Sequence, residues 1–451
     1  MAIIAFEGPA GTGKTWNLMA ALERVVAARP LLDGQKVLAL TFMHGSRRRL
    51  HERLAGMAIL GGRFECSTFD NLAWRLCHRW RQFAIEKGRE FDPAGEYEGT
   101  CAHAGWLLGH REVRSWLRAA FPFVLVDEAQ DLTVPRLSMV QALALDGDLL
   151  LAADEFQCLQ TDLHDNPTIR WLRESVEVEC LTEVKRTDVP GLLDAASALR
   201  RSTPLSLKGS GFRIVEASAP ELMAWHVASA LSAAAKRREA VVVITPARSG
   251  GVVDAVVERV GKAPMGQKWK IGPFPIRWEM TAEVAVLTVL KAIALPEDGC
   301  HRQMSEALSP FKDRPAVALT LDWLSRRAAL GAGEVITAEE VRKQVSTSSA
   351  ALSRLRLAKG ASRPLAMTVQ QAKNREFDGV VVLWPHNVPK HEEHQRRMLY
   401  NAVTRARKWC VVVVLVNKKK DRLVEPPFRI DPAELAKVRA ATAGRRQGRR
   451  R

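Results

Sequence analysis

The sequence lacks any apolar run long enough to cross a membrane. None of its hydrophobic stretches approaches the roughly 18 residues that a spanning helix needs. The opening stretch MAIIAFEGPAG contains neither a basic segment nor a cleavage-site pattern, so it predicts no secretory signal. These two absences predict a cytoplasmic protein that does not bind membranes.

Cysteine is scarce and scattered. The seven cysteines include no CxxC pair. Cys77–His78 and Cys101–Ala102–His103 could be combined into a metal site, but their spacing fits no common zinc pattern. Unpaired cysteines are among the most frequently buried side chains, so free buried thiols are the favoured interpretation.

Acidic residues are too few to balance the basic ones. The chain has 67 Lys and Arg against 50 Asp and Glu, for a formal net charge of +17. This balance favours a polyanionic partner, although a solvated basic surface is the alternative that charge alone leaves open. Part of the excess lies in NKKKDR (417–422) and GRRQGRRR (444–451). The second of these predicts a disordered tail that attracts phosphates without specificity.

Strand-like apolar runs alternate with amphipathic helical stretches, which is typical of parallel sheets with crossover helices. The first part contains predicted strands at 2–6, 36–42, 123–127 and 148–154. A second series follows at 177–181, 212–217, 240–246, 365–369, 379–384 and 410–416. Between about 262 and 360 the sequence is mostly helical, with 278–294 and 316–330 as the clearest helices.

The map predicts an α/β protein of two domains. Residues 1–180 form the first domain, with an insertion at about 75–118. Residues 181–261 and 361–430 form the second, with a helical insertion at 262–360 and a basic tail at 431–451.

GPAGTGKT, residues Gly8–Thr15, matches the phosphate-binding pattern GxxxxGK[ST]. It follows a predicted strand and leads into a helix, which is the context that the motif requires. Backbone N–H groups between Gly8, Gly11 and Gly13 can hold phosphates at the helix N-terminus. Lys14 would reach the β and γ oxygens, and the Thr15 hydroxyl would bind Mg²⁺. A glycine-rich turn before a helix is the alternative, but it does not explain Lys14 and Thr15 in register.

FVLVDEAQDL, residues 123–132, is an apolar strand that ends in acid. Asp127 is placed to bind Mg²⁺ directly or through water. Glu128 is placed to orient and deprotonate the attacking water. The two carboxylates could instead cap the next helix. Together with the phosphate loop, they predict hydrolysis of a nucleoside triphosphate.

The phosphate loop, DEAQD and VTRAR together resemble the UvrD/Rep-like superfamily 1 DNA helicases. Further similar segments follow in family order: LALTF (38–42), CSTFDNLAWRL (66–76), AADEFQ (152–157), LTEVKRT (181–187), MTVQQAKNREFDGVVV (367–382) and RRMLYNAVTRA (396–406). The resemblance implies two RecA-like α/β domains with parallel sheets, each carrying a reduced, mainly helical insertion. It also implies that ATP and Mg²⁺ bind in the cleft between them.

The resemblance implies roles around ATP. Glu128 would act on water, and Gln157 would sense the γ-phosphate. Arg186 and Arg405 would reach ATP from the second domain, where an arginine can accelerate phosphoryl transfer by about 10³–10⁵. Glu376 would contact the ribose.

The resemblance also implies contacts with single-stranded DNA. Thr41, Thr68 and Thr368 would bind phosphates at the ends of strands, where ligands gather in open α/β sheets. Phe42 and Phe69 would stack on bases, with core packing as the alternative for each.

Other positions depart from the family pattern. Arg407 and Lys408 have no family role, and a solvated helix end is the interpretation for both. Lys185 stands where the family has a tyrosine that stacks on adenine, and the chain before Gly8 is too short for the family's adenine-recognising glutamine. Gln160 stands where an aromatic side chain contacts DNA. The insertions are shorter than those of the family, which lowers the expectation of strand separation.

The main hypothesis is an ATP-dependent helicase that translocates 3′–5′ on single-stranded DNA, with 3′-tailed or forked duplexes as further substrates. The alternative is a nucleic-acid-activated NTPase switch that gates a partner effector, such as a nuclease, without productive unwinding. A P-loop kinase for a small metabolite is disfavoured because it leaves Arg186, Arg405 and the net charge of +17 unexplained.

Overall fold

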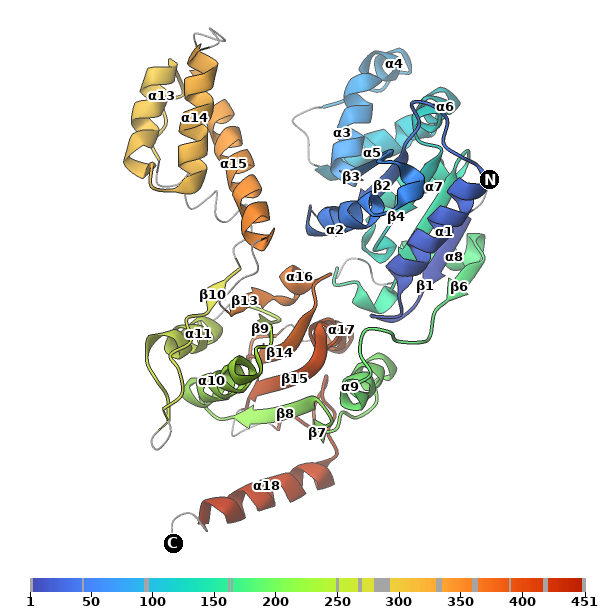
Figure 1. The fold of residues 1–451 in the computed structure, drawn as a ribbon. Coiled ribbons are helices and arrows are strands. Elements are labelled where there is room, and N and C mark those ends of the chain that lie inside the picture. The colour runs from blue at the N-terminus through green and yellow to red at the C-terminus, as the bar shows by residue number, and fades with distance from the viewer. Residues whose placement is uncertain are drawn as a thin grey trace.

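The computed structural model describes residues 3–42, 44–92, 97–160, 163, 165–248, 251–266, 270–279, 293–329, 335–358, 364–388, 391–416 and 421–447. Two α/β domains, each built around its own mainly parallel sheet, carry two groups of helices that project on the same side (Figure 1). This confirms the predicted α/β architecture. No helix within these ranges is long and apolar enough to cross a membrane.

The first sheet has six parallel strands in the order β3-β2-β4-β5-β1-β6. They are β1 (Ile3–Glu7), β2 (Val37–Thr41), β3 (Phe64–Thr68), β4 (Phe123–Val126), β5 (Asp148–Ala153) and β6 (Val178–Cys180). The predicted series of strands omits β3, although Thr68 was placed at a strand end, because FECST lacks an apolar run and is only partly buried. The predicted strand at 177–181 was grouped with the second series, but β6 pairs with β1 and so belongs to the first sheet.

Helices cover both faces of this sheet. They are α1 (Lys14–Ala28), α2 (His44–Ala55), α3 (Phe69–Arg79), α4 (Arg81–Glu86), α5 (Tyr97–Leu108), α6 (Arg111–Ala120), α7 (Val134–Ala144) and α8 (Pro167–Ser175). One face packs Leu18 and Leu22 of α1 against the strands. The other packs Leu72 of α3 and Leu107 of α5, and the predicted insertion at 75–118 is helical here.

The second sheet has the order β10-β13-β9-β14-β15-β8-β7, and only the β7–β8 pair is antiparallel. Its strands are β7 (Lys208–Gly209), β8 (Phe212–Ala217), β9 (Val241–Thr245), β10 (Arg277–Trp278), β13 (Leu365–Thr368), β14 (Phe377–Trp384) and β15 (Ala406–Leu415). Its helices are α9 (Pro190–Arg201), α10 (Pro220–Arg237), α11 (Val252–Lys262), α16 (Val369–Ala372) and α17 (Glu392–Val403).

Arg407 and Lys408 do not lie at a helix end, which corrects the sequence interpretation. Helix α17 ends at Val403, and both cations lie in the first residues of β15. Their exposed side chains pair with Asp378 of β14 at 3.4 Å each. Pairing with a neighbouring strand therefore sets their environment.

The helical insertion of the second domain has its own small core. It contains α13 (His301–Leu308), α14 (Pro315–Ala329) and α15 (Ala338–Ala358), and a two-stranded antiparallel sheet of β11 (Asp298–Gly299) and β12 (Ile336–Thr337). Met304, Val317 and Val341 are fully buried within it. The helix predicted at 316–330 is confirmed as α14. The one predicted at 278–294 is wrong at its start, because Trp278 lies in β10, and residues 280–292 fall outside the described ranges.

The basic tail is helical over most of its length. Helix α18 (Pro432–Gln447) includes residues 444–447, which were predicted to be disordered, while 448–451 lie outside the described ranges. Arg439 attaches this helix to the second domain through ion pairs with Glu216 and Asp421. The basic composition of the tail could not predict these ion pairs, because their acidic partners lie elsewhere in the sequence.

Candidate nucleotide and nucleic-acid site

The phosphate loop, residues 8–15, joins β1 to α1 and is held in place by the segment that follows β6. Gly11 has φ of 86°, and a Cβ there would lie 2.7 Å from Cβ of Arg186. A Cβ on Gly8 would lie 2.5 Å from the carbonyl oxygen of Leu181. Only glycine permits this positive φ and these close approaches without strain. Arg186 from the later part of the chain therefore lies against the phosphate loop.

Lys14 lies over its own loop. Its Nζ donates to the carbonyl oxygens of Gly8 at 2.8 Å and Pro9 at 3.0 Å. The same Nζ is 3.8 Å from Oδ2 of Asp154. Gly13, with φ of 83°, is the N-cap of α1, so the helix begins at Lys14 and directs its first N–H groups at the loop. The loop thus offers a cation and a helix N-terminus to a phosphate.

The predicted metal ligands are adjacent. The Thr15 hydroxyl donates to Oδ2 of Asp127 at 3.1 Å, which brings two hard oxygen donors together. Mg²⁺ binds to such oxygens together with substrate phosphates, so these residues fit the ion. Burial, and then the neighbouring Glu128 carboxylate, raise the pKa of Asp127 to about 6. A bound cation would stabilise the ionised Asp127 carboxylate and so lower its pKa.

Glu128 follows directly in a left-handed conformation, with φ of 59°. Such a conformation is costly for a residue with a side chain and is concentrated at functional sites. Its Oε2 accepts a 2.6 Å bond from Nε2 of Gln130, whose own Oε1 accepts from the backbone N–H of Asp154 at 2.9 Å. Gln130 therefore fixes the Glu128 carboxylate relative to β5.

Arg405 is buried in the boundary between the domains, at 1% exposure. Its Nη2 donates to Oε1 of Gln157 at 3.4 Å, and its Nε donates to the carbonyl oxygen of Asn401 at 3.0 Å. Burial, and then Arg186, lower the pKa of Arg405 to about 10, so it is still charged at neutral pH. The structure thus brings two predicted residues, Gln157 and Arg405, together from different domains.

Arg186 and Glu376 also meet. Nε of Arg186 donates to the Glu376 carboxylate at 2.9 Å, and its Nη1 donates to the carbonyl oxygen of Thr404, next to Arg405. Arg186 therefore links the phosphate loop, where it touches Gly11, to the segment that carries Arg405. All predicted nucleotide-site residues lie around this one boundary.

Asp154 organises a buried network that the sequence interpretation missed. It is fully buried and pairs with Arg200 at 2.7 Å, and it accepts from Gln157 at 2.8 Å. Burial opposes ionisation, but the charges of Lys14 and Arg200 outweigh it and lower the pKa of Asp154. Tyr400 completes the network, since its hydroxyl lies 3.5 Å from Asp154.

Tyr400 also touches the phosphate loop directly. Its hydroxyl accepts a 2.8 Å bond from the backbone N–H of Ala10. A cavity of about 560 Å³ opens beside this contact, between the loop, α9 and α17. Its lining includes Arg186, Arg200 and Arg201, so three cations face it. A polyphosphate would enter a positive environment there.

A second buried ion pair closes the boundary near the acidic motif. Lys373, between α16 and β14, pairs with Asp131, and their side chains are 6% and 9% exposed. Burial lowers the pKa of Lys373, but the carboxylates of Asp131 and Glu128 outweigh it, and the net shift is upward. This pair ties the segment after β4 to the second domain.

Replacing Lys373 with alanine is expected to destabilise the folded state by about 3–5 kcal/mol, because it leaves the Asp131 carboxylate buried and unpaired. Adding Asp131→Asn should restore much of the loss. As a matched control, Arg75→Ala removes the cation of an exposed pair with Glu65, which should cost no more than about 1 kcal/mol. Urea unfolding midpoints compare the three variants. Equal losses for Lys373→Ala and Arg75→Ala would contradict this account.

The predicted DNA-binding threonines end neighbouring strands. Thr41 and Thr68 face each other across β2 and β3, and Thr368 faces Thr245 across β13 and β9. Oγ1 of Thr68 accepts from the backbone N–H of Asn71, which caps α3. Thr368 caps α16 in the same way. Because an accepting hydroxyl keeps its proton, Thr68 and Thr368 can still donate to a phosphate. Thr41 is 0% exposed, so its hydroxyl does not reach a phosphate in this arrangement, and that prediction is corrected.

The two predicted stacking phenylalanines differ. Phe69 is 2% exposed and packs in the core of the first domain, so its ring presents no face to a base, and that prediction is corrected. Phe42 is half-buried, and the guanidinium of Arg136 lies 5.0 Å from its ring centroid. Phe42 therefore keeps a place at the end of β2, beside Thr41.

The cysteines form no metal site in the described ranges, where no group of three or more His, Cys, Asp or Glu side chains is arranged to hold an ion. Burial raises the pKa of Cys77 and Cys101 to about 12, which makes both thiols inert. The cysteines were predicted to be buried, and Cys77, Cys101, Cys158 and Cys410 are, but Cys180 and Cys300 are exposed.

Two family models match the chain. Residues 1–161 match an AAA domain, and residues 365–413 match a UvrD-like helicase C-terminal domain. No curated protein matches the sequence.

Among solved structures, the chain is similar to Arterivirus nonstructural protein 10 (helicase) in complex with DNA, at 11% identity and a TM-score of 0.37, covering 93% of this chain and 62% of that one. The crystal structure of Arterivirus nonstructural protein 10 (helicase) gives 13% identity and a TM-score of 0.38, covering 94% of this chain and 61% of the other. The chain therefore spans less than two thirds of the length of these helicase structures.

Proposed function

Because this chain is a superfamily 1 helicase of the UvrD/Rep-like group, we propose that it hydrolyses ATP at the boundary between its two domains and uses the cycle to move 3′–5′ along single-stranded DNA. The observation that carries the proposal is the contact of Arg405 with Gln157, while Arg186 touches the phosphate loop. We infer that the guanidinium groups of these two arginines, from the second domain, complete a phosphate site built by the first.

The arrangement supports a division of labour in hydrolysis. The loop N–H groups and Lys14 hold the phosphates, and Thr15 and Asp127 would hold Mg²⁺, which supplies positive charge to the β and γ oxygens. Glu128, oriented by Gln130, accepts a proton from the attacking water.

The arginines supply charge only when the two domains are together. Arg405 and Arg186 stabilise the negative charge that develops on the γ-phosphate. Gln157 contacts the γ-phosphate, and its hydrogen bond with Arg405 makes the position of Arg405 depend on whether that phosphate is bound. A site completed only by closure couples hydrolysis to domain motion. Strand-end threonines of both domains would grip the nucleic-acid backbone, so this motion would advance the strand.

The deciding experiment measures NTP hydrolysis with and without single-stranded DNA. We expect stimulation by DNA in the native chain and loss of both basal and stimulated turnover in Lys14→Ala, since Lys14 reaches the phosphates. A folded Lys14→Ala variant that hydrolysed ATP at the native rate would refute the proposal. Single-stranded RNA in a parallel assay tests the choice of DNA. DNA binding should weaken by about 10³–10⁵ between about 50 and 200 mM salt if roughly 6–10 phosphates are neutralised.

The alternative is an NTPase switch that gates a partner effector, such as a nuclease. The side chain of Gln160, which stands where the family has an aromatic residue, donates to the carbonyl oxygen of Asp131 at 3.2 Å and provides no stacking surface. A strand-displacement assay on a 3′-tailed duplex separates the two functions. DNA-stimulated hydrolysis without displacement of the duplex favours the switch.

Trp16 offers a surface for the nucleotide base. It follows Thr15 directly, it is 66% exposed, and Nζ of Lys185 lies 5.6 Å from its ring centroid. The backbone N–H of Lys185 donates to the carbonyl oxygen of Gly11 at 2.7 Å, which holds this pair beside the phosphate loop. A base stacked on this ring would be read by its π-face rather than by hydrogen bonds.

Trp16→Ala is therefore expected to raise KM for ATP roughly tenfold and to leave kcat nearly unchanged, because stacking is worth about 1–3 kcal/mol per base. GTP should suffer equally, and Trp16→Phe should restore most of the affinity. Steady-state kinetics with both nucleotides measure the effect. Trp74→Ala, which removes an exposed tryptophan on α3, is the control. A loss confined to ATP would contradict base stacking without hydrogen-bond readout.

A further inference from the structure

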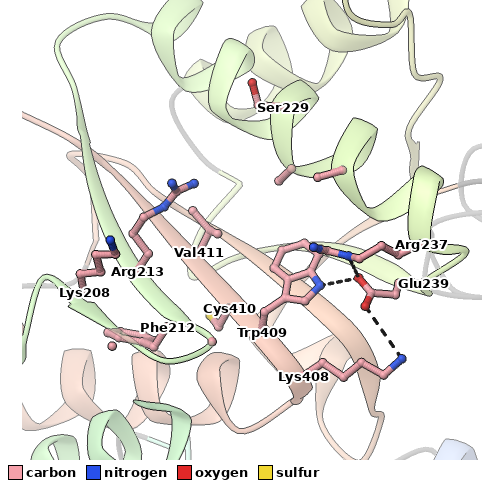
Figure 2. Close-up of a pocket in the computed structure, with 14 residues that line it drawn as sticks. Lys208, Phe212, Arg213, Ser229, Arg237, Glu239, Lys408, Trp409, Cys410 and Val411 are labelled. Carbon is pink, nitrogen blue, oxygen red and sulfur yellow. Dashed lines mark hydrogen bonds and ion pairs between the residues drawn. The ribbon is translucent and has the colours of Figure 1, made fainter. Parts of the chain in front are cut away.

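A hollow of about 520 Å³ opens on the second sheet (Figure 2). It lies between the β7–β8 hairpin, the first residues of β15 and the last turns of α10. None of its lining residues also lines the cavity beside the phosphate loop. The nucleotide chemistry proposed above therefore does not account for it.

The walls of the hollow are strongly cationic. Lys208 and Arg213 stand on the hairpin side, and both are exposed, with no ion pair to any residue that the structure describes. Arg237 and Lys408 stand on the opposite side (Figure 2). Glu239 is the single acid among the lining residues. Four cations thus face one carboxylate.

Glu239 is already occupied. It accepts from Nε of Arg237 at 2.9 Å and from the indole N–H of Trp409 at 2.7 Å, and it lies 3.9 Å from Nζ of Lys408. The charge of Glu239 is therefore balanced by Arg237 and Lys408, which stand on the same side of the hollow (Figure 2). The hairpin wall retains an uncompensated positive charge that favours an anionic occupant.

The floor of the hollow is apolar, and its side chains are largely buried. Phe212, Ala230 and Val411 line it at 3%, 9% and 8% exposure, and α10 contributes the small residues Ser229 and Ala233 before its last residue, Arg237. Small side chains leave α10 unable to fill the space above the strands. Covering an apolar floor with an apolar group is favourable by roughly 25 cal/mol per Å².

The arrangement does not suit a phosphate or a nucleic acid. A phosphate needs donors that converge on one point, whereas these cations stand on opposite walls (Figure 2). Base stacking needs a free ring face, but Trp409 is packed against Gly379, where a Cβ would lie 2.1 Å from the indole. The guanidinium of Arg237 lies 5.8 Å from the Trp409 ring centroid, and Phe212 is only 3% exposed. Neither aromatic residue that lines the hollow therefore has a free ring face on which a base could stack.

We propose that this hollow docks an acidic segment of a partner protein, which inserts one apolar side chain over the floor and places carboxylates against the cations. A chain with Asp or Glu on both sides of a Leu, Phe or Trp meets both the separated charges and the apolar floor. Such an anchor in a pocket with a polar rim is how protein interfaces concentrate their binding energy.

The hollow is close to the segments that carry the two arginines. Lys408 is three residues after Arg405, and the hydroxyl of Thr187, next to Arg186, donates to the carbonyl oxygen of Arg407 at 2.7 Å. A partner seated there contacts the strand that begins beside the nucleotide boundary.

The test pans phage-displayed random short peptides on the full chain, after depletion on the Lys208→Glu/Arg213→Glu double variant. We expect enrichment of acidic peptides that contain a large apolar residue. One enriched peptide, labelled with fluorescein, is then measured by fluorescence polarisation against the native chain and its variants. Because both substituted residues are exposed, thermal unfolding should show that the double variant is folded.

The double variant should weaken binding at least about tenfold. Ala233→Phe, which fills the hollow without changing charge, should do the same, whereas Lys236→Glu, on α10 outside the lining, should stay within about twofold. No enrichment, enrichment of neutral or basic peptides, or equal weakening by Lys236→Glu would overturn the proposal. Displacement of the peptide by oligothymidylate or by inorganic phosphate would also overturn it, in favour of a nucleic-acid or an anion site.

Discussion

Replacing Arg405 with alanine is expected to lower DNA-stimulated ATP turnover by about 10³–10⁵. An arginine that stabilises the charge on a phosphoryl group during its transfer accelerates the reaction by this factor. Arg405 is almost fully buried, yet it reaches Gln157 of the other domain and keeps its charge at neutral pH. Burying a cation carries a desolvation cost, so the buried position of Arg405 favours an anionic ligand that offsets this cost. The γ-phosphate is such a ligand.

The loss should appear in kcat far more than in nucleotide affinity, because the charge it stabilises is largest in the transition state. Arg405→Lys should recover only a small part, since an ammonium cannot donate to the Asn401 carbonyl and to a phosphate in the same geometry. Arg407→Ala is the matched control, because Arg407 is an exposed arginine two residues further on that pairs with Asp378. If both alanine variants lose turnover equally, Arg405 has no special role.

Local motifs predicted well the conformation of the loop from Gly8 to Thr15 and its place between a strand and a helix. The loop from Gly8 to Thr15 requires glycines at fixed offsets, and the strand before it and the helix after it are also local features. Asp127 follows a fully buried strand, and its contact with Thr15 follows from the pairing of parallel strands in one sheet. Where the backbone conformation is encoded by neighbours in sequence, the sequence was sufficient.

Contacts between the domains could not be predicted in this way. Arg200 lies in an ordinary helical sequence. Lys373 and Tyr400 fall within segments that resemble family motifs, but nothing in those segments indicates which residues they contact. Each matters because a residue from the other domain, such as Asp154 or Asp131, meets it across the boundary. Such meetings depend on the relative placement of two folded units, which has no local pattern.

One error was avoidable from the sequence. On α3, Phe69 is followed by Leu72, Ala73, Leu76 and Cys77, which all lie on the buried face of the helix. Apolar residues at these offsets form one stripe of an amphipathic helix. That periodicity places the Phe69 ring in the core, whereas the family resemblance alone suggested a base contact.

Glu128→Gln is expected to lower ATP turnover by about 10²–10⁴, because the amide cannot accept a proton from the attacking water. The substitution keeps the shape of the side chain, and an amide oxygen can still accept the bond from Gln130. It leaves the contact between Thr15 and Asp127 intact, so nucleotide binding should persist. Turnover and binding of a fluorescent ATP analogue, measured on the same preparation, separate the two effects.

The strained backbone at Glu128 strengthens this expectation. A left-handed conformation costs about 1–3 kcal/mol for a residue with a side chain, and such conformations are concentrated at functional sites. Glu65→Gln, which removes a carboxylate paired with exposed Arg75, is the control and should leave turnover unchanged. With hydrolysis blocked and ATP bound, Glu128→Gln should hold the closed arrangement of Arg405 and Gln157. Its affinity for single-stranded DNA in the presence of ATP should then differ from its affinity in the presence of ADP. Equal affinities would mean that the bound nucleotide does not affect DNA binding, and the protein would then be an NTPase that is not coupled to DNA.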